Sequence, residues 1–441
     1  MTYNDESNLK KDMGFMFSPL KNKNLFYFLF FALLFRVLLE VSYVNFVSPL
    51  YFYSGYKINF SFLNYAISWS IFLMGFLVIR DRMSKVSDYF FVMALLSIVA
   101  PITVMYGYDQ GRELRPVLVT LITVFFIYYI TRIKTLSFKK IPIIKGGMKI
   151  VVSTSSMFVL FLVVWYYVSG VTFNLDLAKV YEFRSENSSI AAEGLLTYTN
   201  NWTYKIFNIT LFALSLLYRK YFLAFLIILI QIYFFAASAH KGVLFLPILI
   251  FGIWLYFRKT NSLTVVIPLA FCGIIMFTLF TYFLFDDTLA SSLFSRRVFF
   301  IPAKLTFVYF DFFSSNPHIL WSNSILSPIF SYPYDLSLTH VVGRYLGNES
   351  AGANNGFISS GFAHAGYFGV FLYATILGIL LRFINDITYN LLPLWLAVAL
   401  LVVPLRNVLI SSDLFTVMLT HGFTVTLIII FLLRSKKYAT N

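Results

Sequence analysis

The chain has 441 residues, of which 59% are hydrophobic and 12% charged, and its formal net charge is +15. A soluble globular protein is excluded, because so few charged residues cannot provide it with a polar surface. The apolar runs are continuous and do not alternate with polar residues, which excludes an outer-membrane barrel. The single cysteine, Cys272, leaves no partner for a disulfide or a Cys-based zinc site.

Long apolar runs with short polar interruptions predict an all-α, polytopic membrane protein with about twelve transmembrane helices. The predicted spans are Leu25–Val47, Phe60–Ile79, Tyr89–Met105, Pro116–Ile130, Ile150–Val168, Trp202–Leu217, Tyr221–Ala239, Val243–Phe257, Leu263–Phe285, Tyr367–Leu381, Leu391–Leu409 and Leu414–Leu433. The polar residues 1–24 read as an N-terminal tail, residues 25–433 as one transmembrane domain and residues 434–441 as a C-terminal tail. The first apolar run lacks a cleavage site and is expected to remain as a span.

The distribution of Lys and Arg predicts the orientation of these spans. Most of the 34 basic residues lie in the tails and in alternate short loops, which places both termini in the cytoplasm. The basic charge then reflects membrane topology and gives no reason to expect nucleic acid as a partner. Two long loops, 170–201 and 286–366, fall on the outer side, and so do all five histidines. Any acid–base chemistry is therefore expected outside the cytoplasm.

Charged residues occur within or beside the predicted spans. Arg36 and Glu40 lie four residues apart on the first span, so they share a helix face and can neutralise each other, most simply as a pair that fixes helix packing. Lys241 follows His240 at the turn before the eighth span. An ammonium group beside a helix N-terminus suits a phosphate, but an interfacial lysine explains the position equally.

The loop 286–366 contains groups that suit an anionic ligand. Arg296 and Arg297 precede an aromatic-rich stretch that can lie along the membrane interface, and paired guanidinium groups can bind phosphate oxygens in a bidentate manner. Lys304 and Arg344 add positive charge to the same loop. Anionic lipid headgroups would use the same contacts without any catalysis.

Small polar residues lead from the outer loop into the tenth span. Asn354 and Asn355 begin this run, whose small side chains permit the close packing of a re-entrant segment. His364 follows at the outer mouth of the span, where an imidazole suits a general base, although histidines at such positions are more often structural.

The shorter outer loop and the last two spans contain further polar groups. Arg184 lies among glutamates that include Glu193, an arrangement that fits either a sugar-binding rim or a solvated helix face. Arg406 and His421 lie near the outer ends of the last two spans, where they are expected to face the protein interior because charge in lipid is costly. Phosphate-binding, hydrolase and zinc-peptidase motifs are missing, as is an acidic DxD pair, so neither a metal nor a cofactor is expected.

With these spans and loops, and with the motifs SAHKGVLFLPI, RRVFFIPA and NNGFISSGFAHAGYFG, the chain resembles the bacterial O-antigen and capsule repeat-unit polymerases. The resemblance implies a metal-independent glycosyltransferase of the bacterial inner membrane. Such an enzyme joins undecaprenyl-diphosphate-linked oligosaccharides, its donor and acceptor, on the periplasmic side. A chain-length regulator and a flippase are the expected partners.

The resemblance also implies roles for individual residues. Lys241 and Arg297 would face the diphosphate, Arg184 and Arg344 would handle substrate, and a loop histidine, here His364, is a favoured base in the related ligases. The predicted catalytic residues are therefore His364, Arg297 and Lys241, and the predicted substrate contacts are Arg296, Arg344, Arg184, Asn354, Asn355, His240 and Lys304.

The residues themselves are compatible with this mechanism. A diphosphate is already a leaving group, so the enzyme needs cations to stabilise its charge and a base for the acceptor hydroxyl. Glu193 and Asp311 are the alternatives to His364 as this base.

Two other functions stay open. An O-antigen ligase would share the chemistry and differ in its acceptor. A flippase or other transporter would be expected to carry ionisable groups through the middle of several spans.

Overall fold

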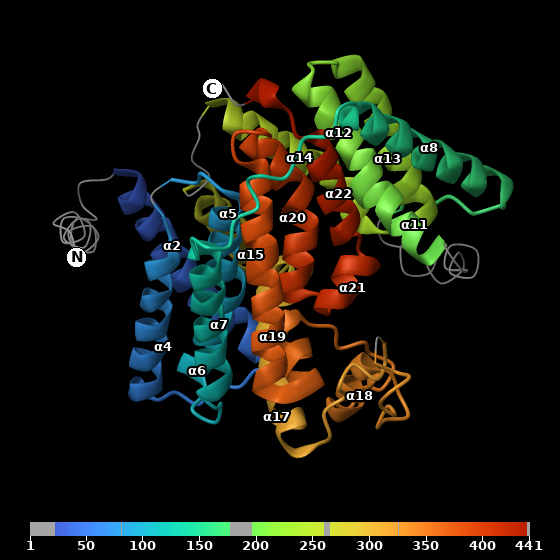
Figure 1. Cartoon of the computed structure of the whole chain (residues 1–441). Coiled ribbons are helices and arrows are strands. Elements are labelled where there is room, and N and C mark those ends of the chain that lie inside the picture. Colours follow the sequence, from blue (N-terminus) through green and yellow to red (C-terminus); the bar gives the residue numbers. More distant parts are fainter. Residues whose placement is uncertain (1–22, 81, 177–195, 260–264, 325, 439–441) are drawn as a thin grey trace. The chain divides into compact units, whose positions relative to one another are not determined.

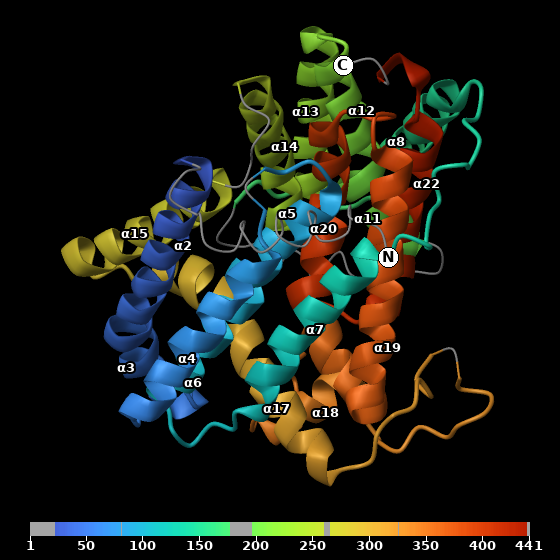
Figure 2. The ribbon, with the colours of Figure 1, turned by 60° about the vertical axis from the view of Figure 1, so that its left-hand side comes forward.

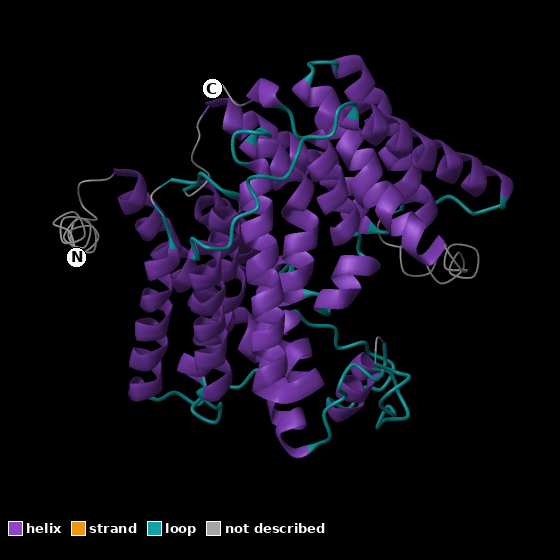
Figure 3. Cartoon of the chain, viewed as in Figure 1, coloured by secondary structure: helices purple, strands orange, loops and turns teal. Residues whose placement is uncertain are grey.

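The computed structural model describes residues 23–80, 82–176, 196–259, 265–324 and 326–438, and throughout these ranges the regular elements are helices (Figures 1 and 3). The strand-like backbone in them is limited to one bridge, between Asn59 and Asp109. The predicted all-α class is confirmed. The predicted site residue Arg184 and its neighbour Glu193 lie outside the described residues.

The helices have the length and composition of membrane spans. Eight helices among the described residues are long and apolar enough to cross a bilayer: Lys23–Ser54, Val86–Tyr108, Arg115–Arg132, Gly147–Val168, Tyr221–Ser238, Val266–Phe285, Thr288–Ser315 and Phe357–Thr388. Four shorter apolar helices cover Phe62–Val78, Gly242–Arg258, Leu394–Ile410 and Phe423–Leu433. The chain is therefore a polytopic membrane protein, while the count of twelve spans stays a prediction.

The helix Thr288–Ser315 differs from the expected pattern, since the sequence placed it in an outer loop along the interface. Asp286 ends the preceding helix in the left-handed conformation, with φ of 51°. Asp287 then starts the next helix, because its carboxylate accepts a hydrogen bond from the backbone N–H of Leu289 at 2.9 Å. The irregular part of the predicted loop 286–366 is thus shorter than expected and follows Ser315.

The chain divides into two compact units, which we describe separately. The first unit comprises residues Met1–Ser84, Asp88–Tyr128 and Asn261–Ala374, and the second comprises Lys85–Ser87, Tyr129–Thr260 and Thr375–Asn441.

The first unit is a bundle whose helices are packed through aromatic and aliphatic side chains. Its main elements are α2 (Lys23–Ser42), η2 (Tyr43–Val47), α3 (Ser48–Tyr51), η3 (Phe52–Ser54), α4 (Phe62–Met74), η4 (Gly75–Val78), α5 (Val86–Ala94), η5 (Leu95–Val99), α6 (Ala100–Tyr108), α7 (Arg115–Arg132), α15 (Val266–Phe285), α16 (Thr288–Ala290), η7 (Ser291–Phe300), α17 (Ile301–Ser315) and α18 (Leu338–Tyr345). Helix α4 lies along α6, and α2 packs on α15 (Figure 2). The α17 helix packs on α6 and so enters the bundle.

Helix α19 (Phe357–Thr388) is broken at Ala365 and Gly366. Gly366 has φ of +57° and ψ of −140°, a combination that strongly favours glycine. A Cβ atom built on Gly369 would lie 2.0 Å from the carbonyl oxygen of Gly361, so the segments on either side of the break lie against each other. The long second segment begins at Tyr367, as expected, and the re-entrant or helix-entry course of the short first segment stays a prediction.

The second unit is formed by α8 (Gly147–Val168), α11 (Leu196–Trp202), η6 (Thr203–Phe207), α12 (Asn208–Leu217), α13 (Tyr221–Ser238), α14 (Lys241–Lys259), α20 (Leu394–Ile410), α21 (Leu414–Leu419), α22 (Phe423–Leu433) and η8 (Lys436–Tyr438), with the end of α19. The helices α12, α14 and α20 pack against one another. The second unit contains a cavity where α14 and α20 meet.

Candidate functional site

A cavity of about 340 Å³ opens in the second unit between α14, α20 and η6. Its lining comprises Lys205, His240, Gly242, Val243, Phe245, Leu246, Leu249, Val402, Val403, Arg406 and Asn407. The basic side chains come from η6, from the turn before α14 and from the end of α20, while aliphatic and aromatic side chains form the remaining wall. The described lining therefore combines basic side chains with apolar ones.

The lining of this cavity includes the start of a long helix. Ala239 ends α13 in the left-handed conformation with φ of 51°, and α14 begins at Lys241. Gly242 and Val243, which line the cavity, therefore belong to the first turn of α14, where the helix dipole is positive, although the N–H of Val243 already donates to the His240 carbonyl at 2.9 Å. Such a place attracts an anion.

A buried glutamine supports the first turn of α14. Pro247 lies inside this helix and has no N–H, so the carbonyl of Val243 loses its usual partner four residues on. The side-chain nitrogen of Gln231, on α13, donates to this carbonyl at 2.9 Å and also to the carbonyl of Tyr204. Asn208 donates to the Gln231 side-chain oxygen at 2.6 Å. This network joins α12, α13, α14 and η6 at Val243, a residue that lines the cavity.

The cations at the cavity have defined surroundings. Lys205 donates to the side chain of Asn201 at 2.6 Å, and its ammonium lies 5.6 Å from the centre of the Tyr204 ring. The Tyr204 ring in turn lies 6.0 Å from that of His240.

A second group of cations forms within the first unit. Arg296 stacks on the ring of Tyr51 at 3.9 Å, and Lys304 lies 5.3 Å from the ring centre of Tyr56. Arg112 donates to the Gly55 carbonyl at 2.7 Å. The charges of Arg112 and Arg296 both act on Lys304. The structure thus brings the predicted residues Arg296 and Lys304 together with an arginine from a different loop.

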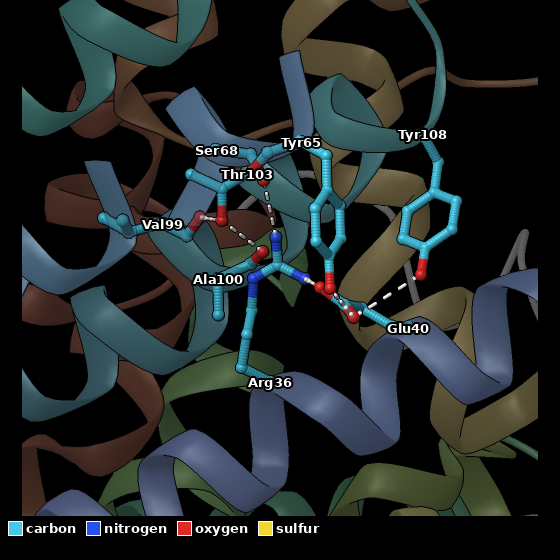
Figure 4. Close-up of polar contacts among 8 residues, drawn as sticks. All are labelled: Arg36, Glu40, Tyr65, Ser68, Val99, Ala100, Thr103 and Tyr108. Atoms are coloured by element: carbon cyan, nitrogen blue, oxygen red, sulfur yellow. Dashed lines mark hydrogen bonds and ion pairs between the residues drawn. The ribbon is translucent and has the colours of Figure 1, made fainter. Parts of the chain in front are cut away.

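The buried ion pair on α2 is the centre of a polar network in the first unit (Figure 4). Arg36 pairs with Glu40 and donates to the Ser68 hydroxyl at 3.1 Å. The hydroxyl groups of Tyr65 and Tyr108 donate to Glu40 at 3.1 and 3.4 Å. The predicted neutralisation of this pair is confirmed, and its contacts join α2, α4 and α6.

His364 is buried at the break in α19. Its Nδ1 atom accepts a hydrogen bond from the backbone N–H of Trp321 at 3.1 Å, and the two rings stack with centres 4.9 Å apart. The indole N–H of Trp321 donates to the Tyr373 hydroxyl at 2.7 Å. In neutral imidazole this arrangement places the proton on Nε2, so the accepting nitrogen is already engaged. These contacts favour the structural interpretation of His364.

The other predicted loop residues are distributed along the first unit. Arg344 is an exposed side chain that forms two hydrogen bonds with Asp335, at 3.1 and 2.8 Å, and one with Glu349 at 3.2 Å. Hydrogen bonding to Arg344 lowers the pKa of Asp335. Asn355 is buried just before α19, and its side chain donates to the Pro302 carbonyl of α17 at 3.0 Å.

For three further predicted residues we report the exposure of the side chain or the position of the backbone. Arg297 and Asn354 have exposed side chains. Lys241 is the first residue of α14, between His240 and Gly242, which line the cavity. Nothing in the spacing along the sequence grouped Lys205 with His240, or Arg112 with Arg296. The only available signal was the predicted outer position of Lys205 and Arg112, shared with many other residues.

No known protein family, curated protein sequence or solved structure matches this chain. Within the described part of the chain, no three His, Cys, Asp or Glu side chains are grouped closely enough to hold a metal ion. The fold defines a polytopic helical membrane protein, and its functional interpretation rests on the two groups of cations.

Proposed function

We propose that the protein is a membrane-embedded glycosyltransferase that polymerises undecaprenyl-diphosphate-linked oligosaccharide repeat units at the outer face of the bacterial inner membrane. The observation that carries this proposal is the cavity of the second unit, which is lined by both basic and apolar side chains. The resemblance of the sequence to repeat-unit polymerases supports the same reaction.

The cavity has the polarity that a lipid diphosphate requires. In such a lipid the charged diphosphate is joined directly to a long apolar chain. Lys205, His240 and Arg406 would contact the diphosphate together with the first turn of α14, and the wall containing Phe245 and Leu249 would contact the start of the isoprenoid chain. Both of these apolar residues are exposed on α14, so the chain can continue from the cavity into the bilayer.

The proposed reaction needs only groups that the protein and its substrates supply. An acceptor hydroxyl oxygen attacks the anomeric carbon of the donor, and the bond from this carbon to the diphosphate oxygen breaks. The cations at the cavity, with Lys241 as a further contact, stabilise the charge that develops on the leaving diphosphate. No cofactor is needed for this step.

A general base receives the proton of the acceptor hydroxyl. His364 is the base proposed from the sequence, but its Nδ1 is already engaged by Trp321. Asp311 is an exposed carboxylate on α17 that accepts a hydrogen bond from Tyr345 at 2.6 Å, and it lines a groove together with Arg112 and Glu113. Asp311 is therefore an alternative base whose carboxylate is accessible to solvent.

Loss of the gene tests the class of reaction. We expect surface polysaccharide from a deletion strain to migrate on a gel as a single repeat unit, because repeat units would still be exported and attached. Attached polymer lost while lipid-linked polymer accumulates would instead indicate an O-antigen ligase. Loss of all surface product would indicate a flippase.

A charge substitution tests the cavity. Arg406→Gln should lower the polymerisation rate by roughly 30- to 1000-fold, since one charge-assisted contact contributes about 2–4 kcal/mol to the transition state. Arg258→Gln is the matched control, because Arg258 is an exposed cation that stacks on Trp254 at the other end of α14. Equal rates for Arg406→Gln and the wild type, at equal amounts in the membrane, would remove the cavity from the mechanism.

A further inference from the structure

The cations of the first unit surround a buried tyrosine hydroxyl without a hydrogen-bond partner. Tyr56 is 1% exposed, and its hydroxyl has no partner within the described structure. The Lys304 ammonium lies over its ring, and the charges of Arg296 and Arg112 both act on its hydroxyl. A buried polar group without a partner costs free energy, so this hydroxyl marks a place where a ligand atom would be stabilising.

Positive charge at this place exceeds negative charge. Asp109 is the carboxylate of the cluster, and its oxygen lies 3.3 Å from the Nε atom of Arg112. Within the described residues, neither Arg296 nor Lys304 has a carboxylate within ion-pair distance, and both are half-buried. The cation–π contacts with Tyr51 and Tyr56 hold these two side chains in position without cancelling their charge.

The Tyr56 hydroxyl is available as a donor. Burial raises its pKa above the usual value, while Arg296 and Arg112 oppose that rise. The phenol therefore stays protonated at neutral pH and can donate to an oxyanion. The Nε atom of Arg296 is a second buried donor without a hydrogen-bond partner in the described structure.

The surroundings of the cluster are those of a membrane interface. The turn that contains Tyr56 is flanked by large exposed apolar side chains: Phe52, Tyr53, Phe60, Phe62 and Leu63. Aromatic residues that follow a hydrophobic helix typically lie at the level of lipid headgroups. A ligand that reaches this site from the membrane would carry its anionic group at the same level.

We propose that Arg112, Arg296, Lys304 and the hydroxyl of Tyr56 form a binding site for the phosphate headgroup of a lipid. Two guanidinium groups and an ammonium group suit a phosphate that carries up to two negative charges, and the phenol adds a neutral donor. The exposed aromatic residues beside the site contact the apolar part of the lipid. This site is built entirely from the first unit and does not depend on the reaction proposed above.

Lipid binding by the purified full-length protein in a neutral detergent tests this site. The probes are phosphatidic acid and a polyprenyl phosphate, with phosphatidylcholine and inorganic phosphate as comparisons. We expect both phosphate-headed lipids to bind more tightly than either comparison. A preference for one of them identifies the source of the phosphate. Inorganic phosphate that binds as tightly as the lipids would overturn the lipid assignment.

Single substitutions locate the binding to this cluster. Lys304→Gln and Arg296→Gln should each weaken lipid binding by about tenfold or more, because each removes one charge-assisted contact. Tyr56→Phe keeps the ring under Lys304 and should weaken binding by about threefold through loss of one neutral hydrogen bond.

Lys57→Gln is the matched control, since Lys57 is an exposed lysine next to Tyr56 and its loss changes the net charge equally. We expect this variant to bind like the wild type. Unchanged binding by Lys304→Gln and Tyr56→Phe, or equal weakening by Lys57→Gln, would overturn the site. If Lys304→Gln does not fold, the comparison of Tyr56→Phe with Lys57→Gln decides.

Discussion

Single charged residues in this protein are stabilised in two distinct ways. Arg36 and Glu40 are buried and neutralise each other, and Ser68 and the two tyrosines add hydrogen bonds to the pair. Removing one partner from such a buried pair leaves an uncompensated charge, which is far costlier than never having had the pair. Arg296 and Lys304 near Tyr56 have no carboxylate partner among the described residues, and that difference separates a packing pair from a candidate ligand site.

At the scale of the element, a proline determines how the cavity is supported. Pro247 frees the Val243 carbonyl within α14, and Gln231 supplies the missing donor from α13. Gln231→Leu should therefore lower the unfolding free energy by about 1–3 kcal/mol for each carbonyl left without a donor. The midpoint of thermal unfolding in detergent measures this loss.

A double substitution isolates the proposed cause. In a Pro247→Ala background the helix regains its own N–H for the Val243 carbonyl, so Gln231→Leu should cost less there than in the wild type. The carbonyl of Tyr204 still loses its donor, and the cost is reduced without disappearing. A cost that is the same in both backgrounds would show that Pro247 is not the reason for the glutamine contact.

The break in α19 shows where element prediction worked and where it did not. The small residues before Tyr367 predicted a re-entrant or helix-entry segment followed by a span, and the structure has a short helical segment that packs against the start of a long one, with Gly361 close to Gly369. The stretch Thr288–Ser315 was predicted to lie outside the bundle, because its charged residues interrupt the apolar pattern. Arg296 and Lys304 in this stretch lie over tyrosine rings, which local hydropathy does not register.

At the scale of the whole molecule, the distribution of basic residues predicts one membrane orientation. The tails and the segment 131–149 should be cytoplasmic, and the segment that follows Ser315 should be outside. In a Cys272→Ser background, which has no cysteine, a membrane-impermeant maleimide applied to intact cells should label Asn348→Cys but not Lys139→Cys. Both positions are exposed, so accessibility within the fold does not decide the result.

Permeabilised cells provide the control, because both cysteines should then react. Labelling of Lys139→Cys in intact cells would overturn the predicted orientation. The same result would also move the turn that contains Tyr56 to the cytoplasmic side, and the phosphate site proposed there would then have to be tested with lipids of the inner leaflet.

By itself, the sequence determined that this is an all-α membrane protein, because continuous apolar runs can satisfy their backbone groups in a bilayer only as helices. It also placed Arg36 beside Glu40, since helical spacing fixes neighbours within one element. Only the tertiary structure brought Arg112 to Arg296, Lys205 to His240 and Trp321 onto His364. These pairs come from different segments, and their proximity depends on how helices pack, which no local spacing along the chain encodes.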